Sequence, residues 1–355
     1  MIKFSLRAVD PGVALLFGGL LAANVAAWAW AFAAFADRPA VMATALLAWV
    51  FGLRHAVDAD HIAAIDNVVR KLMPAGGTPR SVGLWFALGH SSVVVAATLL
   101  LALGVVGFGG DSLLKQIGSL IGTSVSALFL LAIAAINLVI FIGLWRTFRA
   151  ARDGGVHDAA GLEALLERRG LFARLLGPTF RLVTRPWHMY PLGLLFGLGF
   201  DTATEIGLLG ISASEAARGV SLAHLLVFPA LFAAGMALVD TLDSALMVSA
   251  YRWAFVDPLR KLWYNLTITA ASVAVALLIG GIEALGLIAD RFGLSGGAWA
   301  LVEGLNGSLA NVGFAVIALF AVASLVSIVL YRHVMAGAPR IGPDALDCAG
   351  AGEAG

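Results

Sequence analysis

Histidines and carboxylates interrupt four otherwise apolar stretches of the chain, and these residue types together can bind a transition-metal ion. The four polar segments are residues 54–62, 88–94, 198–206 and 235–243. Within or next to them lie three histidines and seven acids: His55, His61, His90, Asp58, Asp60, Asp66, Asp201, Glu205, Asp240 and Asp243. An ionised carboxylate at the centre of a membrane costs roughly 2.5–3.5 kcal/mol. We therefore expect these acids to be paired, protonated, hydrated or bound to a cation.

The first polar segment, RHAVDADHI, is the richest of the four. His55, Asp58 and His61 are three residues apart, so on a regular α-helix they cover one broad face. Asp60 points elsewhere on such a helix, so either it has a different partner or the helix is distorted here. A structural ion-pair cluster is the alternative, but four ionisable side chains within seven positions exceed what packing requires.

The other three segments contribute one histidine and two acid pairs. His90 lies beside two serines, an arrangement that also suits an interhelical hydrogen bond. Asp201 and Glu205 are four residues apart, and Asp240 and Asp243 are three apart. Like charges at these spacings repel unless a cation or a proton lies between them. Either pair could therefore bind metal or carry protons, and the sequence does not separate the two.

The composition indicates which elements position these residues. The chain is 60% hydrophobic and 13% charged, whereas soluble domains carry about 25% charged residues. This predicts an all-α protein that crosses the membrane several times. The net charge of +1 gives no indication of a nucleic-acid partner, and the one cysteine, Cys348, rules out an internal disulfide. Residues 12–36 exceed the apolar region of a signal peptide and fit a first membrane span.

A membrane-spanning helix needs about 20 mostly apolar residues. Eight segments meet this requirement: 12–36, 40–64, 82–107, 119–145, 189–211, 223–250, 264–289 and 310–332. If the N-terminus is cytoplasmic, 18 of the 23 lysines and arginines lie inside and four lie outside, with Arg54 in the first polar segment. The excess of positive charge inside favours eight spans with both ends in the cytoplasm.

This topology divides the chain into five parts. They are a cytoplasmic N-terminus (1–11), four transmembrane helices (12–147), a cytoplasmic loop (148–188), four more transmembrane helices (189–332) and a disordered cytoplasmic tail (333–355). Residues 161–177 of the loop are amphipathic. This stretch fits a helix lying on the membrane surface or a solvated cytoplasmic helix equally well.

Short matches between the two halves suggest an inverted repeat. Phe51-Gly52-Leu53 matches Phe196-Gly197-Leu198 at an offset of 145, and Phe86-Ala87-x-Gly89 matches Phe232-Ala233-x-Gly235 at an offset of 146. Spans 2 and 3 would then correspond to spans 5 and 6 with the opposite orientation. Secondary transporters commonly place their substrate site at such a repeat interface.

The polar segments also resemble the motifs of a known family. Residues 54–62 are similar to the HX4DH motif of the nickel/cobalt transporter family (NiCoT), and residues 86–94, 198–206 and 235–243 resemble its other three motifs in the same order. The resemblance covers about residues 12–332. It implies an eight-helix permease that imports Ni²⁺ or Co²⁺ as its substrate across the bacterial cytoplasmic membrane, with cytoplasmic ends and no cofactor.

The resemblance also implies roles for individual residues. His55, Asp60 and His61 would be the key residues of the first motif, which also contains Asp58. The other three motifs imply further contributors to the metal site, which are His90, Asp201, Glu205, Asp240 and Asp243.

Efflux and an enzymatic activity are the alternatives to uptake. Some efflux relatives carry a histidine-rich cytoplasmic loop, but segment 148–188 contains only His157 and His188, which favours uptake. A metal-dependent membrane enzyme is disfavoured because the HExxH pattern is absent, as is the GxxxxGK[ST] loop of ATP hydrolysis. We therefore expect a non-enzymatic permease whose partners are the ion and the bilayer, with no ATPase subunit required. The choice between Ni²⁺ and Co²⁺, the coupling to protons and the formation of homo-oligomers stay open.

Overall fold

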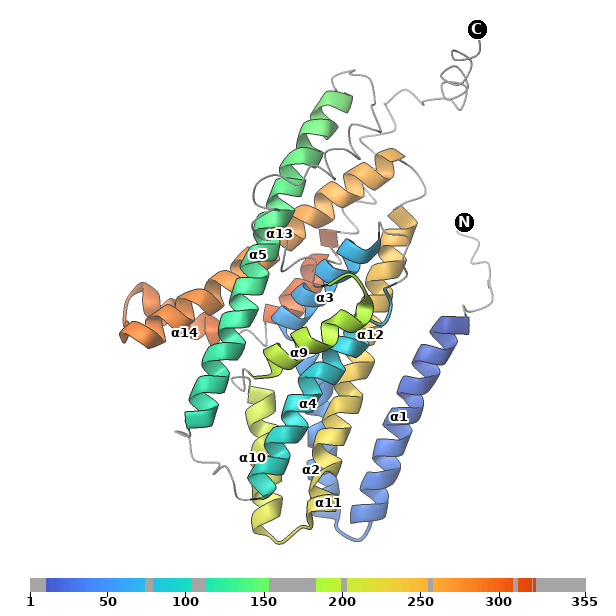
Figure 1. Ribbon diagram of the computed structural model, residues 1–355, viewed down its shortest axis with the longest axis vertical. Helices are drawn as coiled ribbons and strands as arrows, with labels where there is room; N and C mark the ends of the chain where they lie inside the picture. The colour runs from blue at the N-terminus through green and yellow to red at the C-terminus, as the bar shows by residue number, and fades with distance from the viewer. Residues whose placement is uncertain are drawn as a thin grey trace.

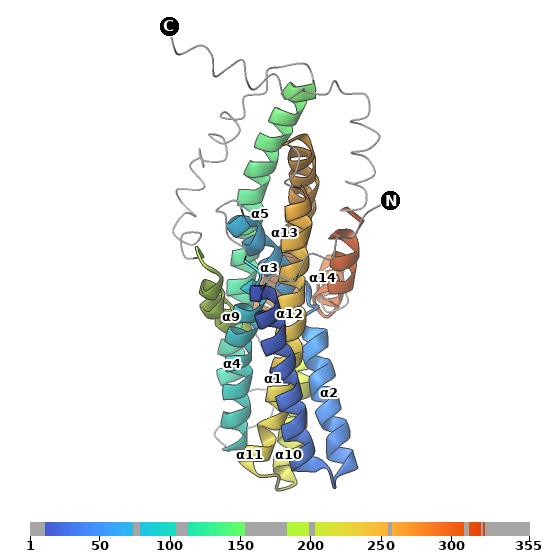
Figure 2. The same ribbon diagram turned by 90° about the vertical axis from the view of Figure 1, so that its right-hand side faces the viewer.

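The protein is an elongated bundle of α-helices (Figures 1 and 2). The computed structural model describes residues 11–73, 79–103, 113–152, 183–198, 203–254, 258–308, 312–320 and 322–323. Within these ranges no strand occurs, which confirms the predicted all-α class. The predicted amphipathic stretch at 161–177 and the tail at 333–355 lie outside the described residues.

The helices follow one another along the chain with short connections. They are α1 (Pro11–Phe35), α2 (Pro39–His55), α3 (Ala59–Leu72), α4 (Val82–Ala102), α5 (Leu113–Arg152), the 3-10 turn η2 (Pro186–His188), α9 (Met189–Gly197), α10 (Ala203–Ala217), α11 (Leu222–Leu225), α12 (Val227–Ala254), α13 (Pro258–Phe292) and α14 (Ala298–Asn306). Residues 312–320 are also helical. Successive long elements alternate in direction, with α1 descending in Figure 1, α2 and α3 ascending, and α4 descending.

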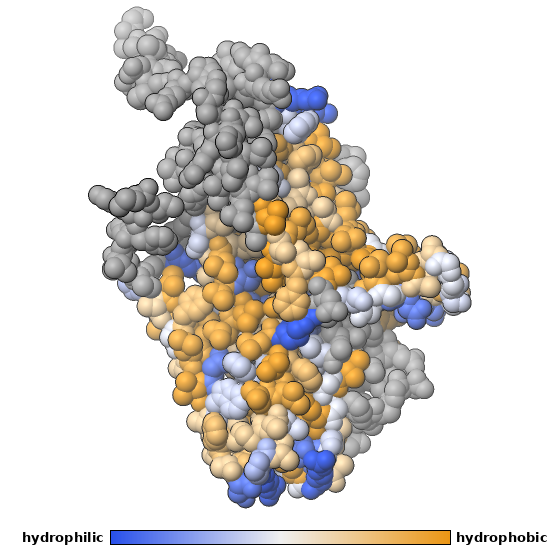
Figure 3. All heavy atoms as spheres, turned by 180° about the vertical axis from the view of Figure 1, so that it is seen from behind, coloured by the Kyte–Doolittle hydropathy of each residue, from blue (hydrophilic) through white to orange (hydrophobic). Residues whose placement is uncertain are grey.

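Five stretches are long and apolar enough to cross a membrane: Pro11–Phe35, Val82–Ala102, Leu120–Gly143, Leu222–Ala250 and Leu266–Phe292. A sixth is obtained if α2 and α3 together form one bent span. Large apolar side chains are exposed along these helices, and the face in Figure 3 is mostly apolar across its middle. Such a surface suits a lipid environment, because soluble proteins rarely expose so large an apolar area to water.

Two of the eight predicted spans are divided in the structure. The segment predicted at 40–64 as one helix is α2 followed by α3, with a bend of 50° between them. The segment predicted at 189–211 is divided into α9 and α10, with residues 199–202 outside the described part. The last predicted span, 310–332, is described only at 312–320 and 322–323.

The break between α2 and α3 has a visible backbone cause. The amide of Asp58 donates to the carbonyl of His55 at 2.8 Å, which forms a tight turn in place of the α-helical pattern. Asp58 then takes an extended conformation, with ψ at 146°, and is the N-cap residue of α3. Its carboxylate makes no capping hydrogen bond to the α3 backbone. The side chain is therefore available for other groups.

Helices of the two halves pack closely on one another near the breaks. α2 lies against α12, and α4 lies against α9. Gly52 on α2 touches the backbone of Phe232 so closely that a Cβ at this position would overlap the Phe232 carbonyl. Small residues permit this approach of helix backbones in membranes. The close packing brings the polar segments of α2, α4 and α12 together.

Candidate metal centre

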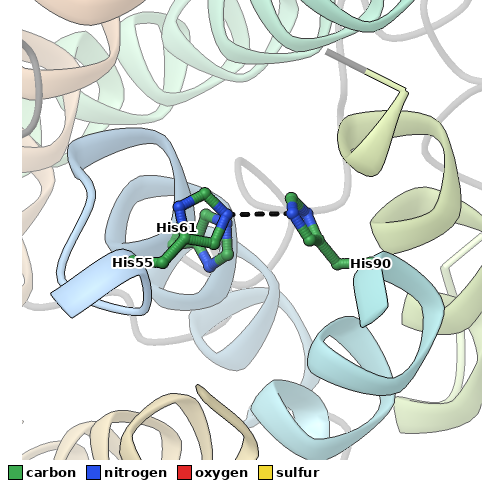
Figure 4. A group of neighbouring side chains, drawn as sticks. All are labelled: His55, His61 and His90. Carbon is green, nitrogen blue, oxygen red and sulfur yellow. Dashed lines mark hydrogen bonds between the residues drawn. The ribbon is translucent and has the colours of Figure 1, made fainter. Parts of the chain in front are cut away.

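Three imidazoles meet in the interior of the bundle (Figure 4). His55 is the last residue of α2, His61 lies in the first turn of α3, and His90 lies in the middle of α4. Their exposed fractions are 1%, 0% and 3%. α3 is bent by 50° from α2 at the break after His55, and the His55 and His61 ring centroids are 4.6 Å apart. One nitrogen from each ring lies within 4.8 Å of the others, close enough for all three to bind one metal ion.

Hydrogen bonds fix the orientation of His55. Its Nδ1 lies 2.9 Å from Oδ2 of Asp58 and 3.1 Å from Oγ1 of Thr204. A carboxylate accepts a hydrogen bond, so Nδ1 carries the proton in this arrangement. The lone pair of Nε2 then points toward the other two histidines. A carboxylate behind a metal-binding imidazole is a common means of fixing its tautomer and raising its basicity.

The centre of the site contains more acceptors than protons. His90 Nε2 lies 2.9 Å from His55 Nε2 and 2.9 Å from Oε1 of Glu205. With His55 protonated at Nδ1, a proton on His90 Nε2 can be directed to only one of these two acceptors. A bound cation would contact all three atoms at once. The arrangement is therefore better suited to a metal ion than to a set of neutral hydrogen bonds.

His61 is the third imidazole of the group. Its Nδ1 lies 3.4 Å from Oδ1 of Asp240 on α12, and its Nε2 is buried with no hydrogen-bond partner among the described residues. The ring lies edge-on to Phe86, with centroids 4.8 Å apart, so packing restricts its rotation. A buried nitrogen without a partner is costly. Coordination of a metal by Nε2 would remove that cost.

An arginine balances part of the negative charge. Arg54 Nη1 lies 2.8 Å from Oδ1 of Asp58, so this carboxylate bridges the guanidinium and the His55 ring. The Arg54 guanidinium also lies over the ring of Phe314, 5.0 Å from its centroid. Arg54 thus balances one acid of its own segment.

The structure places the predicted site residues in three groups. His55, Asp58, His61, His90, Glu205 and Asp240 come together in one buried cluster. Asp60 is half-buried in the first turn of α3, outside the three-histidine group, and Asp243 is half-buried on α12. Asp201 lies outside the described residues. The distortion considered for the first segment is present, since the helix breaks at 56–58.

One contact of the cluster was missed by reasoning from the sequence. Thr204 is buried and bonds to the His55 ring across 149 positions of the chain. A hydroxyl next to the buried Glu205 was the available signal. The partner of Thr204 follows only from the packing of α10 against α2.

Comparison with known proteins places the chain among metal-transport proteins. Residues 41–330 match the model of the NicO family, described as high-affinity nickel-transport protein. The chain is 77% identical over 344 residues to the hydrogenase nickel incorporation protein HupN of Bradyrhizobium diazoefficiens, covering 97% of this chain and 90% of that protein.

Two other relatives extend the comparison. The chain is 56% identical to the high-affinity nickel transport protein of Cupriavidus necator, covering 90% of this chain and 92% of that protein. It is 46% identical to the cobalt transport protein NhlF of Rhodococcus rhodochrous, covering 69% of this chain and 70% of that protein. No solved structure matches the chain. With four-fifths of its length matched and three of its histidines gathered in one buried cluster, the chain belongs to the family of high-affinity nickel-transport proteins.

Proposed function

We propose that the chain is a secondary transporter that imports Ni²⁺ and/or Co²⁺ across the bacterial cytoplasmic membrane. The observation that carries this proposal is the convergence of His55, His61, His90 and Glu205 from four helices on one buried point. Imidazole nitrogen suits nickel and related metals, and family members are named for nickel or cobalt transport. A buried site between broken helices is typical of secondary transporters.

The ligands we propose are Nε2 of His55, Nε2 of His90, Nε2 of His61 and Oε1 of Glu205. Each of these atoms faces the centre or lacks a partner among the described residues. Asp58 and Asp240 contact the far nitrogens of His55 and His61, and we assign them the orientation of these rings.

Three acids of the predicted set are not among the ligands that we propose. Asp60, Asp201 and Asp243 are proposed to line the path of the ion to and from the centre. Asp60 lies one residue before His61, and Asp243 lies one helical turn beyond Asp240. An acidic path would lower the cost of moving a divalent cation through the apolar bundle.

An inverted repeat is proposed to underlie the site. Under the offset of 145, Asp60 corresponds to Glu205, and both lie in the first turn of the helix that follows a break. Gly89 approaches Leu194 on α9, and the corresponding Gly235 approaches the corresponding Trp49 on α2. Corresponding helices thus exchange partners between the halves, as a two-fold relation requires.

Eight spans with both ends in the cytoplasm are proposed with this repeat. The bent α2–α3 pair would form the second span, α9 with α10 the fifth, and 310–332 the eighth. The alternating directions of the helices in Figure 1 support this topology. Segments 1–11, 148–188 and 333–355 would then lie in the cytoplasm, where most lysines and arginines fall.

The membrane potential is the proposed source of energy. A divalent ion moving inward gains about 4.6 kcal/mol per 100 mV, twice the value for a single charge. The family is one of transporters, and we propose that this chain acts without an enzymatic step or an ATPase subunit. The bundle would open the centre alternately to either side by rocking of its two halves.

Uptake of radiolabelled Ni²⁺ and Co²⁺ into vesicles that contain only this protein tests the proposal. With an inside-negative potential and no ATP, we expect saturable accumulation that the variant His55→Ala abolishes. His224→Ala is the matched control, because His224 lies on α11, outside the polar segments. Accumulation by His55→Ala at the wild-type level would overturn the site, and absence of transport by the wild type would overturn the function.

A further inference from the structure

Polar side chains continue beyond the three histidines along α3 and α12. These helices pack on one another, and both run upward in Figure 1. On α3 the next acid after His61 is Asp66, which is fully buried. On α12 Asp243 follows Asp240 by one helical turn. Three carboxylates therefore extend from the centre toward the end of the bundle that we assign to the cytoplasm.

An arginine is held against one of these acids. Arg70 Nη2 lies 2.8 Å from Oδ2 of Asp66, and the Ser272 hydroxyl on α13 donates to the same oxygen at 2.7 Å. The guanidinium also contacts the Ser272 hydroxyl and lies 3.5 Å from the carbonyl oxygen of Ile268. Arg70 thereby joins α3 to α13 with its charge beside a buried carboxylate.

Asp240 and Asp243 each have one carboxylate oxygen without such a partner. Oδ2 of Asp240 and Oδ2 of Asp243 are both buried, with no hydrogen-bond partner among the residues that the structure describes. Asp240 is fully buried, and Asp243 interacts electrostatically with both Asp240 and Asp66. Carboxylate oxygens that are withdrawn from water and left without partners are costly unless a cation reaches them.

We propose that Asp66, Asp243 and the Ser272 hydroxyl form a second, weaker cation site on the inward path, and that the Arg70 guanidinium occupies it while that path is closed. This proposal rests on the proposed function, because the cation is the transported Ni²⁺ or Co²⁺ leaving the histidines. Oxygen ligands alone bind these metals more weakly than imidazole does. An ion would therefore pass from a tight site to a weak one and be released.

Removal of the tethered cation should expose the second site. We expect purified wild-type protein in lipid nanodiscs to bind one equivalent of Ni²⁺ by equilibrium dialysis, and Arg70→Gln to bind two. The second equivalent should be at least about tenfold weaker than the first, since it has no imidazole ligand. The double variant Asp66→Asn with Arg70→Gln should bind one equivalent again.

Lys71→Gln is the matched control, because it removes a neighbouring positive charge on the same helix and should leave one equivalent. One equivalent bound by a folded, monodisperse Arg70→Gln protein would overturn the second site. If Arg70→Gln fails to fold, Asp66→Asn tests the second site instead. Arg70 keeps its contacts with Ser272 and Ile268 in that variant.

For Asp66→Asn we expect unchanged Ni²⁺ affinity at the histidines and an uptake rate at least about tenfold lower. Uptake at the wild-type rate would overturn the second site. The two proposals fail separately. A wild-type protein that transports Ni²⁺ while these variants behave like it would refute only the second site, whereas a wild type that neither binds nor transports Ni²⁺ would refute the function itself.

Discussion

Replacing Asp58 by asparagine would separate the orientation of His55 from the coordination of the metal. The Asp58 carboxylate lies 2.9 Å from Nδ1 of His55, on the side of the ring away from Nε2. An asparagine carbonyl could still accept the Nδ1 proton, so the ring would keep its tautomer. The negative charge that makes Nε2 more basic would be lost.

The size of the effect follows from the position of the carboxylate. Loss of a group that supports a metal-binding histidine typically lowers metal affinity about 10- to 100-fold, which corresponds to about 1.4–2.8 kcal/mol. Calorimetric titration of Ni²⁺ into the protein in nanodiscs would measure the change. Arg54→Gln is the control, because it removes the other partner of Asp58 and leaves the contact between Asp58 and His55 in place.

A double-mutant cycle tests whether Asp58 acts through His55. In a protein that already carries His55→Ala, the further change Asp58→Asn should alter Ni²⁺ affinity by less than about twofold, because the ring to be oriented is gone. A further tenfold loss would mean that Asp58 contacts the ion directly. Unchanged affinity of the single variant Asp58→Asn would refute the orienting role as well.

Two further outcomes follow from the geometry. Glu205→Gln should abolish saturable Ni²⁺ uptake, because Glu205 Oε1 is the anionic atom 2.9 Å from His90 Nε2. Glu215→Gln, which changes a buried acid farther along α10, should retain uptake, and equal loss in both variants would contradict a specific role. Gly52→Ala should lower the free energy of unfolding by about 1–3 kcal/mol, because the new Cβ would overlap the Phe232 backbone. Thermal unfolding in detergent would measure this loss. Gly18→Ala, where a Cβ meets nothing within 4 Å, serves as the control, and equal midpoints for the two variants would count against the packing argument.

The first polar segment shows what the spacing of residues along the chain predicts correctly and what it does not. Spacing by three predicts that His55, Asp58 and His61 share one face of a continuous helix. The structure brings the same three residues together by another route, in which the helix ends at His55 and restarts at Ala59. The sequence carries no glycine or proline at 56–58 to signal this break. In the structure Asp58 at this break lies behind the His55 ring.

The acid pairs downstream illustrate the same limit. The pattern of i, i+3 and i, i+4 acids predicts a need for a cation or a proton, but it treats both members of a pair alike. In the structure Asp240 contacts His61, whereas Asp243 interacts electrostatically with Asp66 and Asp240. Helix periodicity cannot predict this difference, because it depends on which neighbouring helix each carboxylate meets.

The sequence by itself determined the class of the protein and the residue types of its site. Apolar segments long enough to span a bilayer, and histidines with acids inside them, follow from the cost of burying charge in lipid, which acts on each segment locally. The tertiary structure determined which contacts each of these residues makes. Contacts such as Thr204 with His55, and Ser272 with Asp66, join residues about 150 to 200 positions apart, and only the packing of α10 on α2 and of α13 on α3 brings their atoms within bonding distance.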